Sequence, residues 1–124
     1  MYTVGDFIIR IKNAALAKKE EVSAPYSRIS EAVAKVMVKG GFLARINTDE
    51  KKKLLTVGLA YKGKEPALSG ARIISRPGLR IYKRVKDLSL LAPKFTLVST
   101  PRGIMSAKEA KKLGLGGEVL AEIW

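Results

Sequence analysis

The strongest constraint on the fold is a change in the spacing of apolar residues within the first half of the chain. Apolar residues first recur at the interval of an amphipathic helix and then alternate with polar residues, as in half-buried strands. Each such element has only one apolar side to bury, so helices and strands of this kind must pack on each other. The sequence therefore predicts an α+β fold.

Two amphipathic helices are predicted near the N-terminus. The first spans residues 3–19 and has a polar, basic outer face. The second begins at Ser27, a good capping residue, and ends at Gly40-Gly41, because glycine readily adopts the left-handed conformation that closes a helix. Residues 24–26 could supply a short edge strand between the helices. The orders α-β-α-β-β and α-α-β-β both remain open at this point.

A β-hairpin is predicted to follow the second helix. Two alternating segments, 42–46 and 55–61, flank a polar, lysine-rich turn. Within the first segment, Phe42, Ala44 and Ile46 are expected on one face of the strand, with the residues between them on the other.

Residues 62–66 are predicted to separate two small packed modules, because they are polar, contain Gly and Pro, and have no hydrophobic period. We expect an N-terminal α/β module at 1–64, with two helices and a short sheet. We expect a C-terminal module at 65–124 that is mainly β with one short helix.

The single helix of the second module is predicted at 107–113, after the capping pair Ser106 and Glu109. Residues 88–91 are expected to form a short helix or an apolar loop. The predicted strands of this module lie at 71–75, 79–82, 95–99 and 118–124.

The composition excludes most catalytic and metal chemistry. The chain has no Cys and no His, which removes disulfides, thiolate nucleophiles, imidazole bases and nearly all zinc sites. We therefore expect no catalytic residues, no metal site and no cofactor. No apolar run approaches the roughly 18–20 residues of a membrane span, and the first residues lack the pattern of a signal peptide. We expect a cytoplasmic protein without a membrane partner.

The charge indicates a polyanionic partner. The 124 residues carry 24 Lys and Arg against 11 Asp and Glu, a formal net charge of +13. Each cation that neutralises a phosphate releases a condensed counterion, which favours nucleic-acid binding. The segment 72–86 holds several basic residues and no acidic one, together with Tyr82 and a Pro77-Gly78 turn. This run is either a solvated face or a surface for RNA phosphates and bases.

Two short segments are candidates for specific RNA contacts. The segment Ser99–Gly103 offers two hydroxyls, a guanidinium and a flexible glycine between a strand and a capped helix, which suits either an ordinary turn or contact with RNA sugars. Gly116 and Gly117 either follow a helix cap as a plain turn or let a nucleic-acid backbone approach closely. Glu118 could accept hydrogen bonds from the edge of a nucleobase, or it could neutralise a neighbouring Arg or Lys. Tyr82 is expected either to be half-buried or to stack on an unpaired base.

Two other functional classes compete with specific RNA binding. A DNA-compacting or other non-specific nucleic-acid protein would need the same charge. A small phosphotransfer or hydrolytic enzyme is disfavoured by the missing His and Cys, and because the glycines follow a helix whereas phosphate-binding loops precede one.

Several motifs resemble one family along the whole chain. The stretch 99–120, with Ile123-Trp124 at the end, closely resembles the C-terminal signature of bacterial small ribosomal subunit protein eight. Residues 10–13, 40–43 and 76–82 resemble its first-helix motif, its second-helix exit and its central strand turn. The chain departs from the family pattern at Ala121, where Cys is frequent, and at Tyr26, where a small residue is usual.

The resemblance implies a structural, non-enzymatic constituent of the small ribosomal subunit in the cytoplasm. Such a protein binds the central domain of 16S rRNA and helps assemble the platform of the 30S subunit. The resemblance also implies that the protein is a monomer when free and that small-subunit proteins five and twelve are its neighbours in the ribosome. In some members of the family, it implies binding to the protein's own operon mRNA.

Carried over by motif, the residues expected to contact RNA come from three parts of the chain. Those of the C-terminal loops and their surroundings are Ser99, Thr100, Pro101, Arg102, Gly103, Tyr82, Gly116, Gly117 and Glu118. The bases expected to add affinity are Arg76, Arg80, Lys83 and Arg84. Those of the first helix are Arg10, Lys12 and Asn13.

Overall fold

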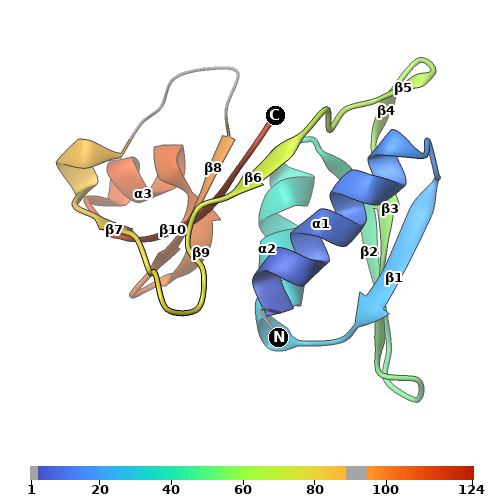
Figure 1. Ribbon diagram of the computed structural model, residues 1–124, viewed down its shortest axis with the longest axis horizontal. Helices are drawn as coiled ribbons and strands as arrows, with labels where there is room; N and C mark the ends of the chain where they lie inside the picture. Colours follow the sequence, from blue (N-terminus) through green and yellow to red (C-terminus); the bar gives the residue numbers. More distant parts are fainter. Residues whose placement is uncertain (1–2, 89–94) are drawn as a thin grey trace.

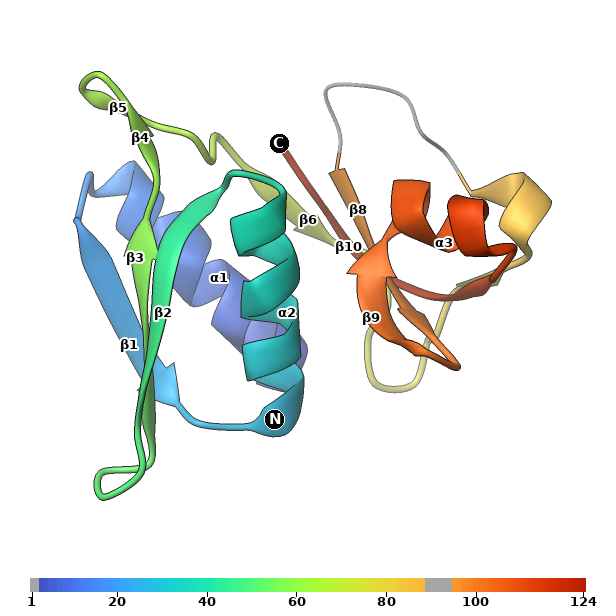
Figure 2. The ribbon, with the colours of Figure 1, turned by 180° about the vertical axis from the view of Figure 1, so that it is seen from behind.

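Two helices lie between a three-stranded sheet and the five-stranded sheet that forms later in the chain (Figures 1 and 2). The computed structural model describes residues 3–88 and 95–124. Its mixture of helices and antiparallel sheets confirms the predicted α+β class. None of the helices in the described part of the chain is both long and apolar enough to cross a membrane.

The N-terminal half follows the order α-β-α-β-β, the first of the two predicted alternatives. Its strands form an antiparallel sheet in the order β1-β3-β2. The elements are α1 (Thr3–Leu16), β1 (Glu21–Pro25), α2 (Arg28–Lys39), β2 (Leu43–Asp49) and β3 (Leu54–Leu59).

The first helix is shorter than the predicted 3–19. It ends at Leu16 because Lys18 adopts a left-handed conformation with φ of 55°. The amide of Lys19 then reaches back to the carbonyl of Ala14, and that of Lys18 to Ala15, each at 3.0 Å. This double closure satisfies the last carbonyls and stops the helix even without a glycine.

The second helix is closed at both ends as predicted. The Ser27 hydroxyl accepts a hydrogen bond from the Ser30 amide at 3.1 Å, which caps the N-terminus. Gly41 takes a φ of +85° just beyond the C-terminus. Beside the cap, Tyr26 donates its hydroxyl to the Glu31 carboxylate at 3.1 Å. This hydrogen bond is the main cause that raises the pKa of Tyr26.

The predicted faces of the first hairpin strand are wrong at Ala44. Leu43 pairs with Leu59, whereas Arg45 pairs with Gly58, so Ala44 is the extra residue of a β-bulge. The bulge breaks the two-residue period. Leu43 is therefore buried and Ala44 exposed, the reverse of what simple alternation predicts.

The C-terminal half contains short strands and one helix. The five-stranded sheet has the order β6-β10-β8-β9, with β7 also paired to β10. The elements are β4 (Tyr61–Lys62), β5 (Glu65–Pro66), β6 (Ala71–Ile73), β7 (Tyr82–Lys83), a 3-10 turn (Val85–Asp87), β8 (Phe95–Thr100), β9 (Gly103–Ser106), α3 (Ala107–Leu113) and β10 (Gly117–Ile123).

Several C-terminal predictions need correction. The strand β9 precedes α3, where the sequence predicted only a loop. The strand expected at 71–75 ends at Ile73, and the strand expected at 79–82 is displaced to β7 at Tyr82–Lys83. Between them, the buried Ser75 hydroxyl donates to the Val119 carbonyl and accepts from the Ile81 amide. The segment predicted at 88–91 lies outside the described residues except for Leu88.

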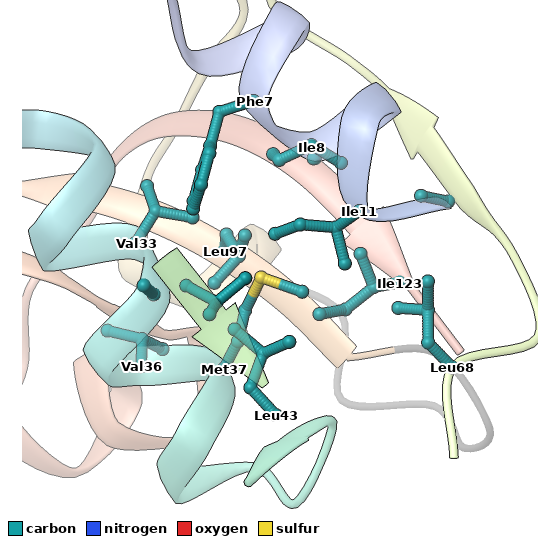
Figure 3. Close-up of a cluster of buried hydrophobic side chains, with 14 of the residues drawn as sticks. Phe7, Ile8, Ile11, Val33, Val36, Met37, Leu43, Leu68, Leu97 and Ile123 are labelled. Carbon is teal, nitrogen blue, oxygen red and sulfur yellow. The ribbon is translucent and has the colours of Figure 1, made fainter. Parts of the chain in front are cut away.

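The predicted module boundary at 62–66 is a tight hairpin, β4 with β5, and one core extends to both sides of it. Leu97 and Ile123 of the C-terminal half pack in the same buried cluster as Phe7 and Met37 of the N-terminal half (Figure 3). The rings of Phe42 and Phe95 also meet edge to face, with centroids 5.4 Å apart. The division at 64/65 stays a prediction, since packing joins the two halves.

The shared core predicts that the two halves unfold together. Leu97→Ala should cost about 2–5 kcal/mol, because it leaves a cavity where both halves meet. Far-UV circular dichroism follows mainly α1 and α2, whereas fluorescence follows Trp124, the single Trp of the chain. We expect both signals to shift to the same lower transition temperature.

The matched control is Leu113→Ala, at a leucine that is 47% exposed, which should cost little. Two separate transitions in Leu97→Ala, one for each signal, would contradict a shared core.

Candidate nucleic-acid interface

Three residues far apart in the sequence form a row across the C-terminal sheet. At the start of β10, Glu118 pairs with Tyr82 of β7 on one side and with Ser99 of β8 on the other. Directly opposed residues of antiparallel strands project from the same face of a sheet. An aromatic ring, a carboxylate and a hydroxyl therefore lie side by side.

This row lines an open cleft of about 760 Å³. Tyr82 is 69% exposed, so its ring is available for contact and the half-buried alternative is wrong. Val85 also lines the cleft, although as an apolar residue in a basic run it gave no signal in the sequence. The lining residues are Tyr82, Lys83, Arg84, Val85, Ser99, Pro101, Gly116, Gly117 and Glu118.

The two glycines at the cleft allow backbone to pack on backbone. A Cβ at Gly117 would lie 2.1 Å from the Ser99 carbonyl oxygen, and one at Gly116 would lie 2.6 Å from that of Lys83. Any side chain there would push β10 away from its neighbours. Close packing of backbone on backbone within the protein thus explains why positions 116 and 117 are glycine. Gly114 has a different role, because with φ of +70° it caps the C-terminus of α3.

The segment Ser99–Gly103 is the turn of the β8–β9 hairpin. Thr100 is buried, donates its hydroxyl to the Gly103 carbonyl at 2.8 Å and accepts from the Arg102 amide at 3.2 Å. Its hydroxyl therefore fixes the turn, while Ser99 and Pro101 line the cleft. Arg102 is exposed at the tip.

Opposite charges meet at the cleft. Arg80 donates to the Glu118 carboxylate at 3.1 Å, which is the neutralising alternative predicted for this acid. Arg84 pairs with Asp87 at 3.4 Å, and both side chains are largely exposed. Lys83 and Arg84 add positive charge to the cleft wall.

The remaining predicted residues lie elsewhere. Arg76 lines a separate hollow beside Leu79. Arg10 and Asn13 line a groove between α1 and β1, and Arg10 pairs with Asp6 at 3.0 Å. Lys12 is half-buried on α1 and is not among the residues that line this groove.

Comparison with known proteins gives a consistent result along the chain. The sequence profile of a family described as "Ribosomal protein S8" matches residues 2–124. A protein of Trichormus variabilis named "Small ribosomal subunit protein uS8" is 38% identical over 128 residues, which cover 98% of this chain and 96% of the relative. Its namesake in Caldanaerobacter subterraneus is 40% identical over 126 residues, with the same two coverages.

The backbone packing at the cleft predicts that Gly117→Ala destabilises the fold. The added methyl group must displace the Ser99 carbonyl, and forced overpacking of this kind costs about 1–3 kcal/mol or more. Urea unfolding would measure the loss. Gly78→Ala is the control, because nothing lies within 4 Å of its Cβ position and only backbone strain from its φ of +86° remains. Equal or smaller loss at Gly117 than at Gly78 would contradict the packing argument.

Proposed function

The chain belongs to the ribosomal protein S8 family, and on this premise we propose that it binds the central domain of 16S rRNA and helps assemble the platform of the 30S subunit. Proteins of this family are structural constituents of the small ribosomal subunit and not enzymes.

The observation that carries the proposal is the row Tyr82, Glu118 and Ser99 in a basic-walled cleft. An unpaired base can stack on an exposed aromatic ring, and a hydroxyl or carboxylate can bond to base edges or 2′-hydroxyls. Lys83 and Arg84 would contact the flanking phosphates. An irregular RNA helix with an internal loop presents such bases, whereas a regular duplex keeps them stacked.

The other predicted contacts extend this surface in the proposal. Pro101, Arg102 and Gly103 would approach the RNA at the hairpin tip, with Thr100 holding their turn. Gly116 and Gly117 would border the same cleft, and Arg76 would add charge in the separate hollow that it lines. A second contact with rRNA would come from the N-terminal half. It would use the groove lined by Arg10 and Asn13, together with Lys12 on the same helix.

The proposed partners include ribosomal proteins and a second RNA. A free monomer in the cytoplasm would join small-subunit proteins five and twelve in the ribosome, and would bind its own operon mRNA if that RNA presents a similar loop. Resemblance to the family supports these partners.

Competition binding at about 150 mM salt would test the proposed function. At this ionic strength weak non-specific contacts are already reduced. The labelled ligand is the central-domain rRNA hairpin with its internal loop, and the competitors are the same hairpin made fully paired and duplex DNA. We expect the intact hairpin to bind at least about 100-fold more tightly, or about 2.7 kcal/mol. Equal competition by all three would favour a non-specific nucleic-acid protein.

Tyr82→Ala should weaken binding of the intact hairpin by about 1–3 kcal/mol, the usual range for one stacked base. It should change binding of the fully paired hairpin little, because that RNA offers no free base. Since Tyr82 is exposed, the transition temperature of the protein should stay the same. An equal loss on both RNAs would contradict a stacking role.

Lys83→Gln should weaken binding of both RNAs alike. Loss of one phosphate contact should make the slope of log affinity against log salt shallower by about one unit. The control is Lys52→Gln at the tip of the β2–β3 hairpin, which removes the same charge from a turn outside the cleft. A slope that does not change in Lys83→Gln would remove this residue from the interface.

A further inference from the structure

Glu118 is the one acid among the described residues that line the cleft. Its side chain is only 14% exposed. A carboxylate that has lost most of its water is unfavourable unless an opposite charge or hydrogen-bond donors compensate it. Approach of an RNA polyanion would increase this penalty. Two things therefore need explanation: why an acid stands at this position, and which group compensates the lost hydration of its carboxylate.

Arg80 supplies the compensation. It lies in the connection between β6 and β7, and its Nη1 reaches the Glu118 Oε2 at 3.1 Å. The contact neutralises the carboxylate and holds it in one orientation, since a charged hydrogen bond is short and directional. The two residues are 38 positions apart, so this contact depends on the tertiary structure.

The other cations of the cleft are placed differently. Arg84 pairs with Asp87 only three residues along the chain, with side chains 76% and 50% exposed. Such an exposed pair contributes little and exchanges easily with a phosphate. Lys83 has no ion pair within the described part of the chain, so its ammonium group is free to follow the RNA backbone.

The position of Glu118 suits recognition. It stands directly between Tyr82 and Ser99, and neighbouring strands lie about 5 Å apart. A nucleotide held by the Tyr82 ring thus has the carboxylate within reach of its hydrogen-bond donors. A carboxylate accepts from amino and imino groups of a base edge and from a 2′-hydroxyl, and it repels phosphate.

We infer that Arg80 is a positioning residue that holds Glu118 ready to read a donor group of an unpaired nucleotide, and that it is not itself a phosphate contact. The inference rests on the proposed function and deepens it. It separates Arg80 from Lys83 and Arg84, although all three belong to one basic run in the sequence.

A double-mutant cycle would test this separation. Affinities for the intact and the fully paired hairpin are measured over a series of salt concentrations for Arg80→Gln, Glu118→Gln and the double variant. The preference is the ratio of the affinities for the intact and the fully paired hairpin. We expect this ratio to fall at least about tenfold in each single variant. The double variant should match Glu118→Gln within about twofold, because Glu118, the carboxylate that Arg80 positions in this inference, is already absent.

The salt dependence distinguishes positioning from phosphate contact. In the Glu118→Gln background, Arg80→Gln should leave the salt slope unchanged, whereas Lys83→Gln should make it shallower by about one unit. Arg80→Lys keeps the charge near Glu118 and should restore part of the preference that Arg80→Gln loses. Thermal unfolding of every variant separates these effects from a loss of structure.

Two results would overturn the inference. One is a salt slope about one unit shallower when Arg80 is removed in the Glu118→Gln background, which would make Arg80 a phosphate contact. The other is an unchanged preference in Glu118→Gln. If the unmodified protein shows no preference for the intact hairpin, the proposed function itself fails, and that result is distinct from either of these.

Discussion

The last strand, β10, joins the parts of this protein on which both stability and the cleft depend. It is hydrogen-bonded to β6, β7 and β8. A register shift between Val119 and Ala121 makes Leu120 an extra residue, and the bulge lets adjacent side chains enter different apolar clusters. Val119 packs under α3, whereas Leu120 and Ala121 pack in the core that reaches α1 and α2. The N-terminal end of the same strand carries Glu118 into the cleft.

This arrangement connects packing to recognition. Gly116 and Gly117 let the backbone of β10 fit between β7 and β8, and that fit brings the Tyr82 ring and the Ser99 hydroxyl to either side of the carboxylate. In the proposed function, the net charge of +13 attracts any nucleic acid over long distances. Discrimination would come from a few groups held at strand spacing, because charge alone carries no sequence or shape information.

Much of the fold could be predicted from periodicity and capping residues. The second helix, the first hairpin and α3 depend on local patterns, and the structure has them where the sequence placed them. The predictions are wrong where an irregular backbone conformation or a non-local strand pairing overrides the local pattern. Lys18 closes α1 early in a conformation that favours glycine, the bulge at Ala44 reverses two faces, and β9 is formed by pairing with β8.

For the candidate site, the sequence by itself determined the kinds of groups available: the excess of bases, the absence of His and Cys, and the motifs that identify the family. The tertiary structure alone decided which groups meet. Tyr82, Ser99 and Glu118 become neighbours only through the register of three strands, and Arg80 becomes the partner of Glu118 only through the turn before β7. The physical reason is that strand pairing is non-local. A local pattern fixes the period of each strand, whereas its partner and register depend on packing of the whole chain.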